Sequence, residues 1–359
     1  MNRRRALRAL LALPLVASGK RATAAGIPAA LGYMPWWMAA GWEAMPLSHL
    51  DRLVLFDAPI AADGALQERG WLKLAPGLPA HCARAGVPID LALTLLEHAQ
   101  FEALFADAAR RARLLEAAAA VLEQPYIAGL HLDVEGYSEV SPQAIAGFGA
   151  WLGELDMHRR ALGKGLSAFF PASDAFRAYD ERAARRMDYW VVQLYDAHWP
   201  ESKVTGPLLT RAPQNAVAVP RALKRLLALD VPRESLLLSV PLYGWEWSSA
   251  SEQPGAATLG RARLLTFQET PAELMPNDRL VASALAQRHG LLRDAEHTPY
   301  YVYRDGRRWR QGWFEDLESL TRKLEPERGA GYGGLAFFPL GYDKGEIVAP
   351  LLRWWRAPR

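Results

Sequence analysis

Eight short runs of apolar, β-branched and aromatic residues recur along the chain, separated by Ala/Leu/Arg-rich segments with helical spacing. Strand and helix alternating eight times predict an α/β fold, a parallel (β/α)8 TIM barrel. A doubly wound sheet is the alternative, but no Gly-rich phosphate-binding turn follows the first run. The predicted strands are residues 30–34, 52–56, 88–93, 127–134, 166–170, 187–195, 235–242 and 334–338.

The seventh and eighth predicted strands are separated by the longest gap. Within this gap, Asp305-Gly306 lies between two β-rich runs, and Asp-Gly in such a position is a strong signal for a β-hairpin. We therefore expect a small α+β insertion at about residues 248–312. The insertion would belong to a single domain over residues 26–359.

Residues 1–25 have the features of a signal peptide. Arginines 3–5 precede an apolar run at residues 9–18, and the small residues Ala22-Thr23-Ala24 fit a cleavage site. The apolar run is shorter than the roughly 20 residues that span a bilayer, and we expect no transmembrane segment after the signal is removed. Export to the periplasm or the extracellular space is predicted, with an uncleaved anchor or a basic tail as the alternatives.

Charge and cysteine content exclude several classes of protein. The formal net charge of +3 comes from the basic residues of the leader, and the rest of the chain is mildly acidic. We therefore expect no nucleic acid partner. The single cysteine, Cys82, excludes an intramolecular disulfide and a cysteine-based zinc site.

Titratable residues alternate with apolar residues along the fourth predicted strand. His131, Asp133 and Glu135 share one face, because residues i and i+2 of a strand point the same way. Gly136 then ends the strand, which places Glu135 at the carboxyl rim, where barrel enzymes hold their active sites. Two neighbouring carboxyl groups do not both ionise easily, so one should have the raised pKa that a general acid requires.

Two other interpretations of this strand stay open at the level of the residues. Asp133 and Glu135 could form a structural pair hydrogen-bonded to neighbouring strands. His131, Asp133 and Glu135 could also bind a metal ion, but no second histidine stands at a ligand spacing. We expect no metal and no cofactor.

The fourth strand resembles the signature of glycoside hydrolase family 18, the chitinases and endo-N-acetylglucosaminidases. The signature is Asp-x-x-Asp-x-Asp-x-Glu, and its last two acids match Asp133 and Glu135. Further family-like segments follow in the family's order, which is more specific than any one match. They are residues 31–37, 187–196, 240–245, 314–320 and 333–338.

The resemblance implies an enzyme that hydrolyses β-linked N-acetylglucosamine polysaccharide with retention, the substrate's own acetamido oxygen acting as the nucleophile. Glu135 would be the acid and base, and Asp133 would orient the acetamido N–H and stabilise the oxazolinium intermediate. Tyr195 would hydrogen-bond the acetamido carbonyl, and Asp196 would bind a sugar hydroxyl. The other residues implied in substrate binding are Gln193, His131, Tyr33, Trp37, Trp245 and Phe338.

The sequence departs from the family pattern at several of these positions. Ala128 and His131 replace the first two signature aspartates, so His131 must take over the role of the second or leave it vacant. Gln193 replaces a methionine, and Phe338 replaces the tryptophan beneath the reactive sugar. These changes keep the acid but leave the polymer open among chitin, peptidoglycan and a secreted exopolysaccharide.

Two alternative functions follow from the same residues. A non-catalytic glycan-binding lectin could be built on the barrel, although a lectin needs none of Glu135, Asp133 and Tyr195 as a set. A muramidase-type lysozyme also has an Asp-x-Glu strand, but the matches at the seventh and eighth strands disfavour it. The expected partner is a GlcNAc-containing polysaccharide or oligosaccharide, and we expect a monomer.

Overall fold

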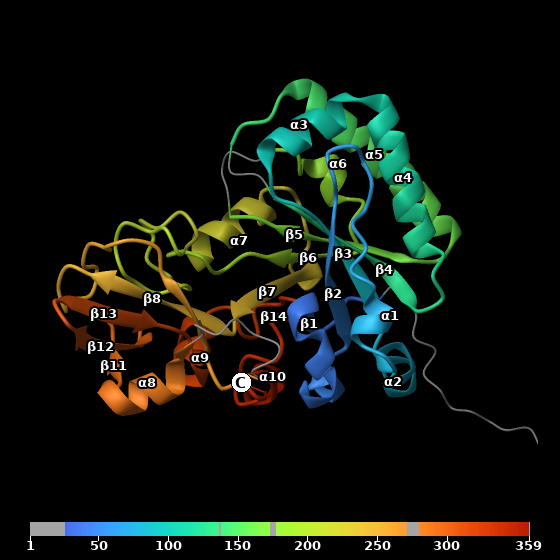
Figure 1. The fold of residues 1–359 in the computed structure, drawn as a ribbon. Coiled ribbons are helices and arrows are strands. Elements are labelled where there is room, and N and C mark those ends of the chain that lie inside the picture. The colour runs from blue at the N-terminus through green and yellow to red at the C-terminus, as the bar shows by residue number, and fades with distance from the viewer. Residues whose placement is uncertain (1–25, 136–137, 173–176, 271–279, 359) are drawn as a thin grey trace, which may run out of the picture.

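The structure is a computed structural model that describes residues 26–135, 138–172, 177–270 and 280–358. Within these residues, eight parallel strands close into a barrel in the order β1-β14-β7-β6-β5-β4-β3-β2, which confirms the predicted fold (Figure 1). The leader and Gly136 lie outside the described residues. The barrel strands are β1 (Ala30–Pro35), β2 (Arg52–Pro59), β3 (Ile89–Leu95), β4 (Ile127–Val134), β5 (Gly165–Phe170), β6 (Tyr189–Val192), β7 (Leu236–Pro241) and β14 (Gly334–Phe338).

Helices cover the outside of the barrel and bury its outward-facing apolar side chains. The longest is α5, which begins where the Ser141 hydroxyl accepts the Ala144 N–H, and Phe148 and Trp151 of this helix pack against Phe105. No helix in the described part of the chain is both long and apolar enough to cross a membrane. The helices are α1 (Trp71–Leu74), α2 (Leu78–Ala85), α3 (His98–Ala106), α4 (Ala108–Leu122), α5 (Pro142–Ala161), α6 (Glu181–Ala184), α7 (Val219–Leu227), α8 (Ala282–His289), α9 (Leu317–Leu324), α10 (Val348–Arg356), and the 3-10 turns η1 (Trp36–Ala44), η2 (Leu47–His49) and η3 (Arg233–Ser235).

Two barrel strands end three residues away from the end that the sequence pattern predicts. Strand β6 ends at Val192, and after the Gln193 N–H bonds the Phe170 carbonyl the chain turns away, reaching φ 67° at Asp196. Strand β2 continues to Pro59 through a register shift after Leu55. The acid and the proline at the end of β2 break the apolar pattern, which is why the prediction stops too early there.

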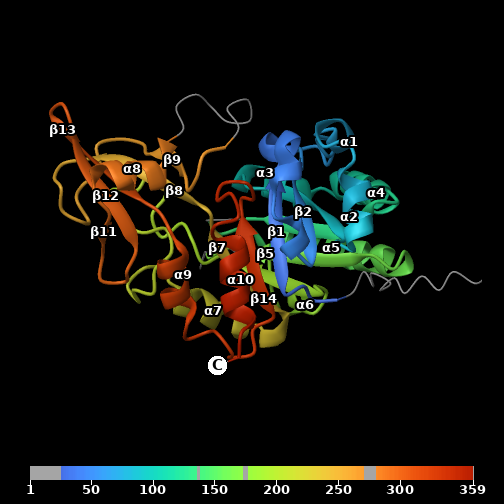
Figure 2. The same cartoon turned by 90° about the horizontal axis from the view of Figure 1, so that it is seen from below.

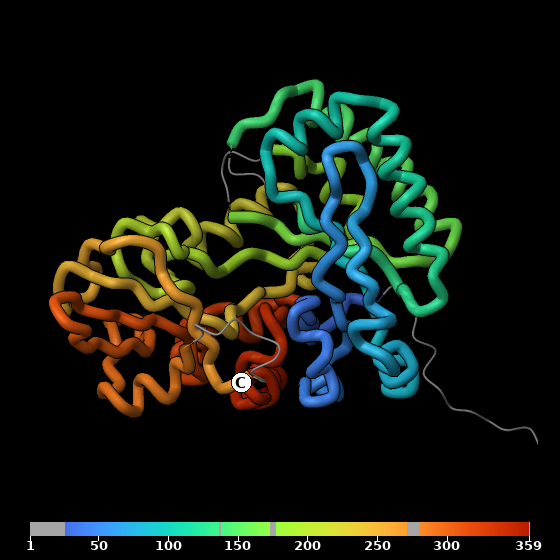
Figure 3. Tube along the Cα trace, in the orientation of Figure 1, coloured from blue at the N-terminus to red at the C-terminus, as the bar shows by residue number. Residues whose placement is uncertain are grey.

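A long narrow connection follows β2, rising from the barrel and returning before α1 (Figure 3). Its two arms meet in an antiparallel bridge between Ile60 and Leu66, and Gly64 turns the chain with φ 89°. The returning arm brings Arg69 back beside the end of β2, where its guanidinium bonds Asp57. This connection therefore delivers a distant cation to the carboxyl end of the barrel.

A second sheet stands beside the barrel (Figure 2). It has the order β10-β9-β8-β13-β12-β11, and β8 begins at Tyr243 directly after β7, upstream of residue 248, where the insertion is predicted to start. The hairpin predicted at Asp305-Gly306 joins β12 to β13. The strands of this sheet are β8 (Tyr243–Ser249), β9 (Arg263–Thr266), β10 (Leu280–Val281), β11 (Leu292–Arg293), β12 (Pro299–Asp305) and β13 (Arg308–Trp313).

Replacement of Lys323 by Met should destabilise the protein by about 3 kcal/mol, because it leaves a buried carboxylate without its cation. The Lys323 ammonium lies 2.7 and 2.9 Å from the two oxygens of Glu315, and both side chains are almost fully buried. Urea denaturation measures the change in unfolding free energy. The matched control is Lys344→Met, which removes an exposed partner of Glu269 and should change stability little. Equal losses in the two variants would contradict the expectation.

Candidate active site

Strand β4 carries its polar residues on the inner face of the barrel. His131 and Asp133 are buried among the inward-facing side chains, with Leu132 and Val134 at the alternating positions. Beyond the last strand residue, the Glu135 N–H donates to the Leu95 carbonyl of β3 at 3.0 Å. The backbone ladder thus carries Glu135 to the carboxyl end of the barrel, the position that the alternation in the sequence indicates.

Asp133 and Glu135 form a pair of carboxyl groups that share a hydrogen bond. Burial raises the pKa of Asp133 well above its ordinary value, and the negative charges of Glu135 and then Asp57 raise it further. The hydrogen bond between the Asp133 and Glu135 side chains acts in the same direction, so Asp133 holds a proton and donates it toward Glu135. Among the described residues, Asp133 Oδ1 has no hydrogen-bond partner although it is buried. The pair can therefore move a proton and accept one further donor.

His131 is fully buried and both of its ring nitrogens have partners. Nε2 lies 2.9 Å from the Tyr33 hydroxyl, and Nδ1 lies 2.9 Å from the Ser167 hydroxyl. Burial lowers the pKa of His131 to about 3, so the ring is neutral near pH 7. His131 is therefore hydrogen-bonded to two hydroxyl groups, on β1 and β5. With both ring nitrogens occupied, it does not share the proton of the Asp133–Glu135 pair.

Aromatic rings surround the end of the barrel beside these acids. The Phe338 ring stacks on Tyr195, with centroids 6.2 Å apart and planes at 16°. Tyr33 and Phe56 contact Phe338 edge-on at 5.9 and 5.2 Å. Sugar rings bind to such aromatic faces through their apolar C–H surfaces, so this cluster can hold a pyranose.

Trp37 and Trp245 lie at the edge of this aromatic cluster. The Trp37 indole N–H donates to the Tyr342 hydroxyl at 3.0 Å, and its ring contacts Phe56. Trp245 contacts Tyr243 edge-on at 5.4 Å. Both side chains are half-buried and packed against protein neighbours.

A second group of polar residues follows β6, which is separated from β4 by β5 alone. The Tyr243 hydroxyl donates to Asp196 Oδ1 at 2.6 Å, and the Gln193 oxygen accepts the Ala172 N–H at 2.8 Å. Burial raises the pKa of Asp196 to about 6, against the lowering effect of hydrogen bonds from Tyr243 and Gln193. Asp196 therefore changes charge just below neutral pH. Tyr243 was not predicted as a site residue, although it stands in one of the family-like segments.

Replacement of Tyr243 by Phe should raise the pKa of Asp196 above its value of about 6, because the lost hydroxyl stabilises the ionised carboxylate. Titration of the Asp196 side-chain carbon by NMR measures the shift. Tyr300→Phe on the neighbouring sheet is the control and should leave Asp196 unchanged, since the Tyr300 ring stacks on Trp313. An unchanged or lowered value in Tyr243→Phe would show that the hydroxyl does not stabilise the carboxylate.

A fourth carboxyl group at this end of the barrel was missed by the sequence analysis. Asp57 accepts the Thr94 hydroxyl on Oδ2 at 2.6 Å, and Arg69 donates to Oδ1 from Nε at 3.2 Å and from Nη2 at 3.0 Å. The available signal was an acid directly after the apolar run of the second strand. Such an acid lies at the carboxyl rim in a parallel barrel.

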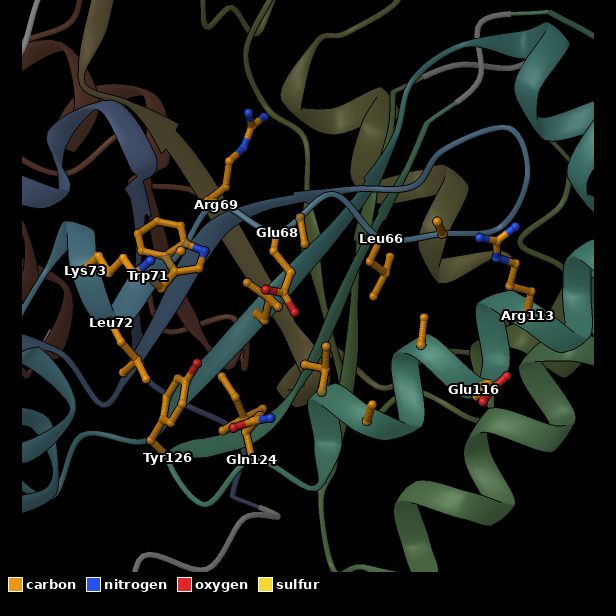
Figure 4. A pocket seen from close by; sticks show the side chains of 18 residues that line it. Leu66, Glu68, Arg69, Trp71, Leu72, Lys73, Arg113, Glu116, Gln124 and Tyr126 are labelled. Atoms are coloured by element: carbon orange, nitrogen blue, oxygen red, sulfur yellow. The ribbon is translucent and has the colours of Figure 1, made fainter.

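A separate hollow of about 710 Å³ lies on the outer side of the barrel, between residues 65–73 and helix α4 (Figure 4). Leu66, Glu68 and Tyr126 line it. Figure 4 shows the Arg69 side chain pointing the opposite way from Glu68. Arg69 thus borders the hollow with its backbone side and directs its charge to the site inside the barrel.

The sequence model of the glycosyl hydrolases family 18 matches residues 96–343, more than half of the chain. The protein belongs to this family, which confirms the resemblance and defines its class as a glycosidase. A curated relative, YdhD of Bacillus subtilis (strain 168), is named as a sporulation-specific glycosylase and is 27% identical over 205 residues. That match covers 55% of this chain and 43% of the relative, so the chain spans less than half of the relative's length.

Solved structures share the same fold. The family GH18 chitinase of Cycas revoluta in complex with allosamidin has a TM-score of 0.74 at 19% identity, over 91% of this chain and 99% of that chain. Catalytic domain 2 of the Ostrinia furnacalis Group II chitinase has a TM-score of 0.74 at 20% identity, over 92% and 97%. The spore cortex-lytic enzyme SleL of Bacillus cereus has a TM-score of 0.67 at 18% identity, over 91% and 73%.

Proposed function

We propose that the protein is an exported glycoside hydrolase that cleaves β-linked N-acetylglucosamine polysaccharide with retention, with the substrate's acetamido group as the nucleophile. The carboxyl pair carries this proposal. Asp133 is buried and donates its proton in a hydrogen bond to Glu135. Among the described residues, its Oδ1 atom has no hydrogen-bond partner. An acetamido N–H is a donor of the kind that this oxygen lacks.

In the first half of the proposed reaction, Glu135 protonates the glycosidic oxygen as the bond to C1 breaks. The acetamido oxygen attacks C1 and closes a positively charged oxazolinium ring. Asp133, having passed its proton to Glu135, faces this cation as a carboxylate and accepts the acetamido N–H. In the second half, Glu135 takes a proton from water, which attacks C1 and reopens the ring, so the configuration at C1 is retained.

The remaining residues would hold the reactive sugar. The stacked rings of Tyr195 and Phe338 would support the pyranose face, and the Tyr195 hydroxyl would hold the acetamido carbonyl in line for attack. Asp196, held by Tyr243, would accept a sugar hydroxyl. Gln193 and His131 use hydrogen-bonding groups on protein partners, which favours a supporting role for both.

The names of the relatives and of their ligands guide the choice of polymers to test. Solved GH18 chitinases have been crystallised with GlcNAc oligomers, as the Cycas revoluta complex with (GlcNAc)3 shows. SleL is named for lysis of the spore cortex, and YdhD is named as a sporulation-specific glycosylase. Chitin fragments, peptidoglycan and exopolysaccharide are therefore the substrates to test. The basic and apolar pattern of residues 1–25 supports export to reach such polymers.

The test is a panel of GlcNAc oligomers, their deacetylated forms and peptidoglycan fragments, with products identified by mass spectrometry. We expect cleavage only beside acetylated sugars, because a free amine supplies no acetamido oxygen. The freshly released sugar from a β-linkage should be the β-anomer. Binding without cleavage of any member would support the glycan-binding lectin instead, and cleavage beside deacetylated sugars would contradict the substrate-assisted mechanism.

A further inference from the structure

The carboxylate of Asp57 has no part in the reaction described above, yet it is buried beside the site. Asp57 lies near the end of β2 and is 7% exposed. Thr94 donates to one oxygen, and the Arg69 guanidinium donates twice to the other. Every one of these contacts uses Asp57 as an acceptor. The residue is therefore held as a carboxylate in a defined orientation.

Asp57 is separated from Asp133 by a single strand. Thr94 on β3 is the register partner of Asp133 on β4, and the same Thr94 hydroxyl bonds Asp57 on β2. The three residues thus form a row across three neighbouring strands at the carboxyl end of the barrel. Carboxyl groups on strands this close together interact strongly where water is excluded.

The groups that face Asp133 come from several elements. On β4 itself, Glu135 is acidic and His131 is a neutral ring bonded to Tyr33 and Ser167. Tyr33 on β1 and Tyr179 before α6 are neutral phenols that interact with the same carboxyl. Among the described residues, Glu135 and Asp57 are the charged groups that act most on Asp133, and both are negative.

We propose that Asp57 is a positioning residue for the hydrolytic reaction, a fixed negative charge on β2 that holds the shared proton on the Asp133–Glu135 pair. The inference rests on the proposed function of that pair. His131 cannot supply this negative charge, since an imidazole ring is neutral or positive, and both of its nitrogens are bonded to hydroxyl groups. Arg69 moderates the charge of Asp57, and its guanidinium is kept in place by the Trp36 ring, 4.9 Å away.

The proposal predicts opposite shifts in the pH profile for two variants. In Asp57→Asn the negative charge is lost, the pair releases its protons more readily, and both limbs of kcat/KM against pH should move about one unit lower. In Arg69→Gln the charge of Asp57 is no longer moderated, and both limbs should move higher. A structural role alone would lower the rate at every pH and leave the limbs in place.

The matched control is Arg113→Gln. Arg113 is an exposed arginine that pairs with Asp63 in the connection after β2, and its loss should leave the profile unchanged. Limbs that stay within about 0.3 unit in both test variants, or that move in the same direction in both, would overturn the proposal. If Asp57→Asn does not fold, Arg69→Gln decides alone, because the Arg69 side chain is partly exposed and Gln keeps a hydrogen-bond donor there.

A second measurement keeps this inference separate from the proposed function. NMR titration of aspartate side-chain carbons, with Asp133 assigned from the Asp133→Asn spectrum, follows the carboxyl pair without any substrate. The Asp133 signal should titrate at lower pH in Asp57→Asn and at higher pH in Arg69→Gln. If the wild type cleaves no member of the panel, the proposed function fails, while these two shifts still test Asp57.

Discussion

Replacement of Glu135 by Gln should lower kcat by about three orders of magnitude and leave substrate binding nearly intact, since the amide cannot give a proton to the leaving oxygen. Glu135 stands one residue beyond β4, where its backbone bonds Leu95, so the substitution changes the chemistry and not the position of the side chain. The rate of product release from a GlcNAc oligomer and the calorimetric affinity for the same oligomer provide the two measurements.

The control for this experiment is Glu139→Gln, which alters an exposed acid a few residues further along the chain. Its rate should equal that of the wild type. A Glu135→Gln variant that retains more than about a tenth of the wild-type kcat would remove Glu135 as the general acid. Loss of binding together with rate in Glu135→Gln would assign it a role in holding the ground state.

Replacement of Asp133 by Asn should lower the activity of the enzyme and raise its stability. Turnover should fall by about two to three orders of magnitude, because a neutral amide does not stabilise the cationic intermediate. Stability should rise at neutral and alkaline pH. Because the pKa of Asp133 is raised, the folded protein keeps a proton on this carboxyl that the unfolded chain releases. The cost to stability increases as the pH rises above the ordinary range of an aspartate. An asparagine has no such cost.

Rates on a GlcNAc oligomer and urea denaturation at several pH values measure these two effects. The stability difference between Asp133→Asn and the wild type should vanish in acid, where the unfolded chain also binds the proton. Asp305→Asn, at the exposed end of β12, is the control and should show neither effect. A variant that is less stable than the wild type at high pH would show that Asp133 is well solvated or paired as a carboxylate.

The barrel could be predicted because its eight strands are buried on both faces and appear as apolar runs. The alternation of His131, Asp133 and Glu135 likewise predicted that these residues share the inner face of β4, with Glu135 at its carboxyl end. The ends of strands were predicted less well, because the residues there serve the site more than the core. Asp57 and Tyr195 illustrate this: one extends a strand that was predicted to stop, and the other lies beyond a strand that was predicted to include it.

Contacts between distant segments left weaker signals in the sequence. Arg69 reaches Asp57 because a long connection folds back on itself, and no local pattern indicates where such a connection returns. The neutrality of His131 depends on its burial inside the closed barrel, where hydroxyl groups from β1 and β5 meet its ring. Such contacts and protonation states depend on the closed barrel as a whole. A sequence pattern can therefore indicate which residue belongs to the site, but not whether that residue is protonated.

Strand β8 starts at Tyr243, and the hydroxyl of this first residue holds Asp196 in the barrel. The side sheet is therefore not a freely exchangeable module. A chimera that grafts another family member's sheet after Tyr243 keeps the hydrogen bond, whereas a graft one residue earlier must supply an equivalent donor. For anyone exchanging these sheets to change which polymer is bound, the safe junction lies inside β8, between Tyr243 and the rest of the strand.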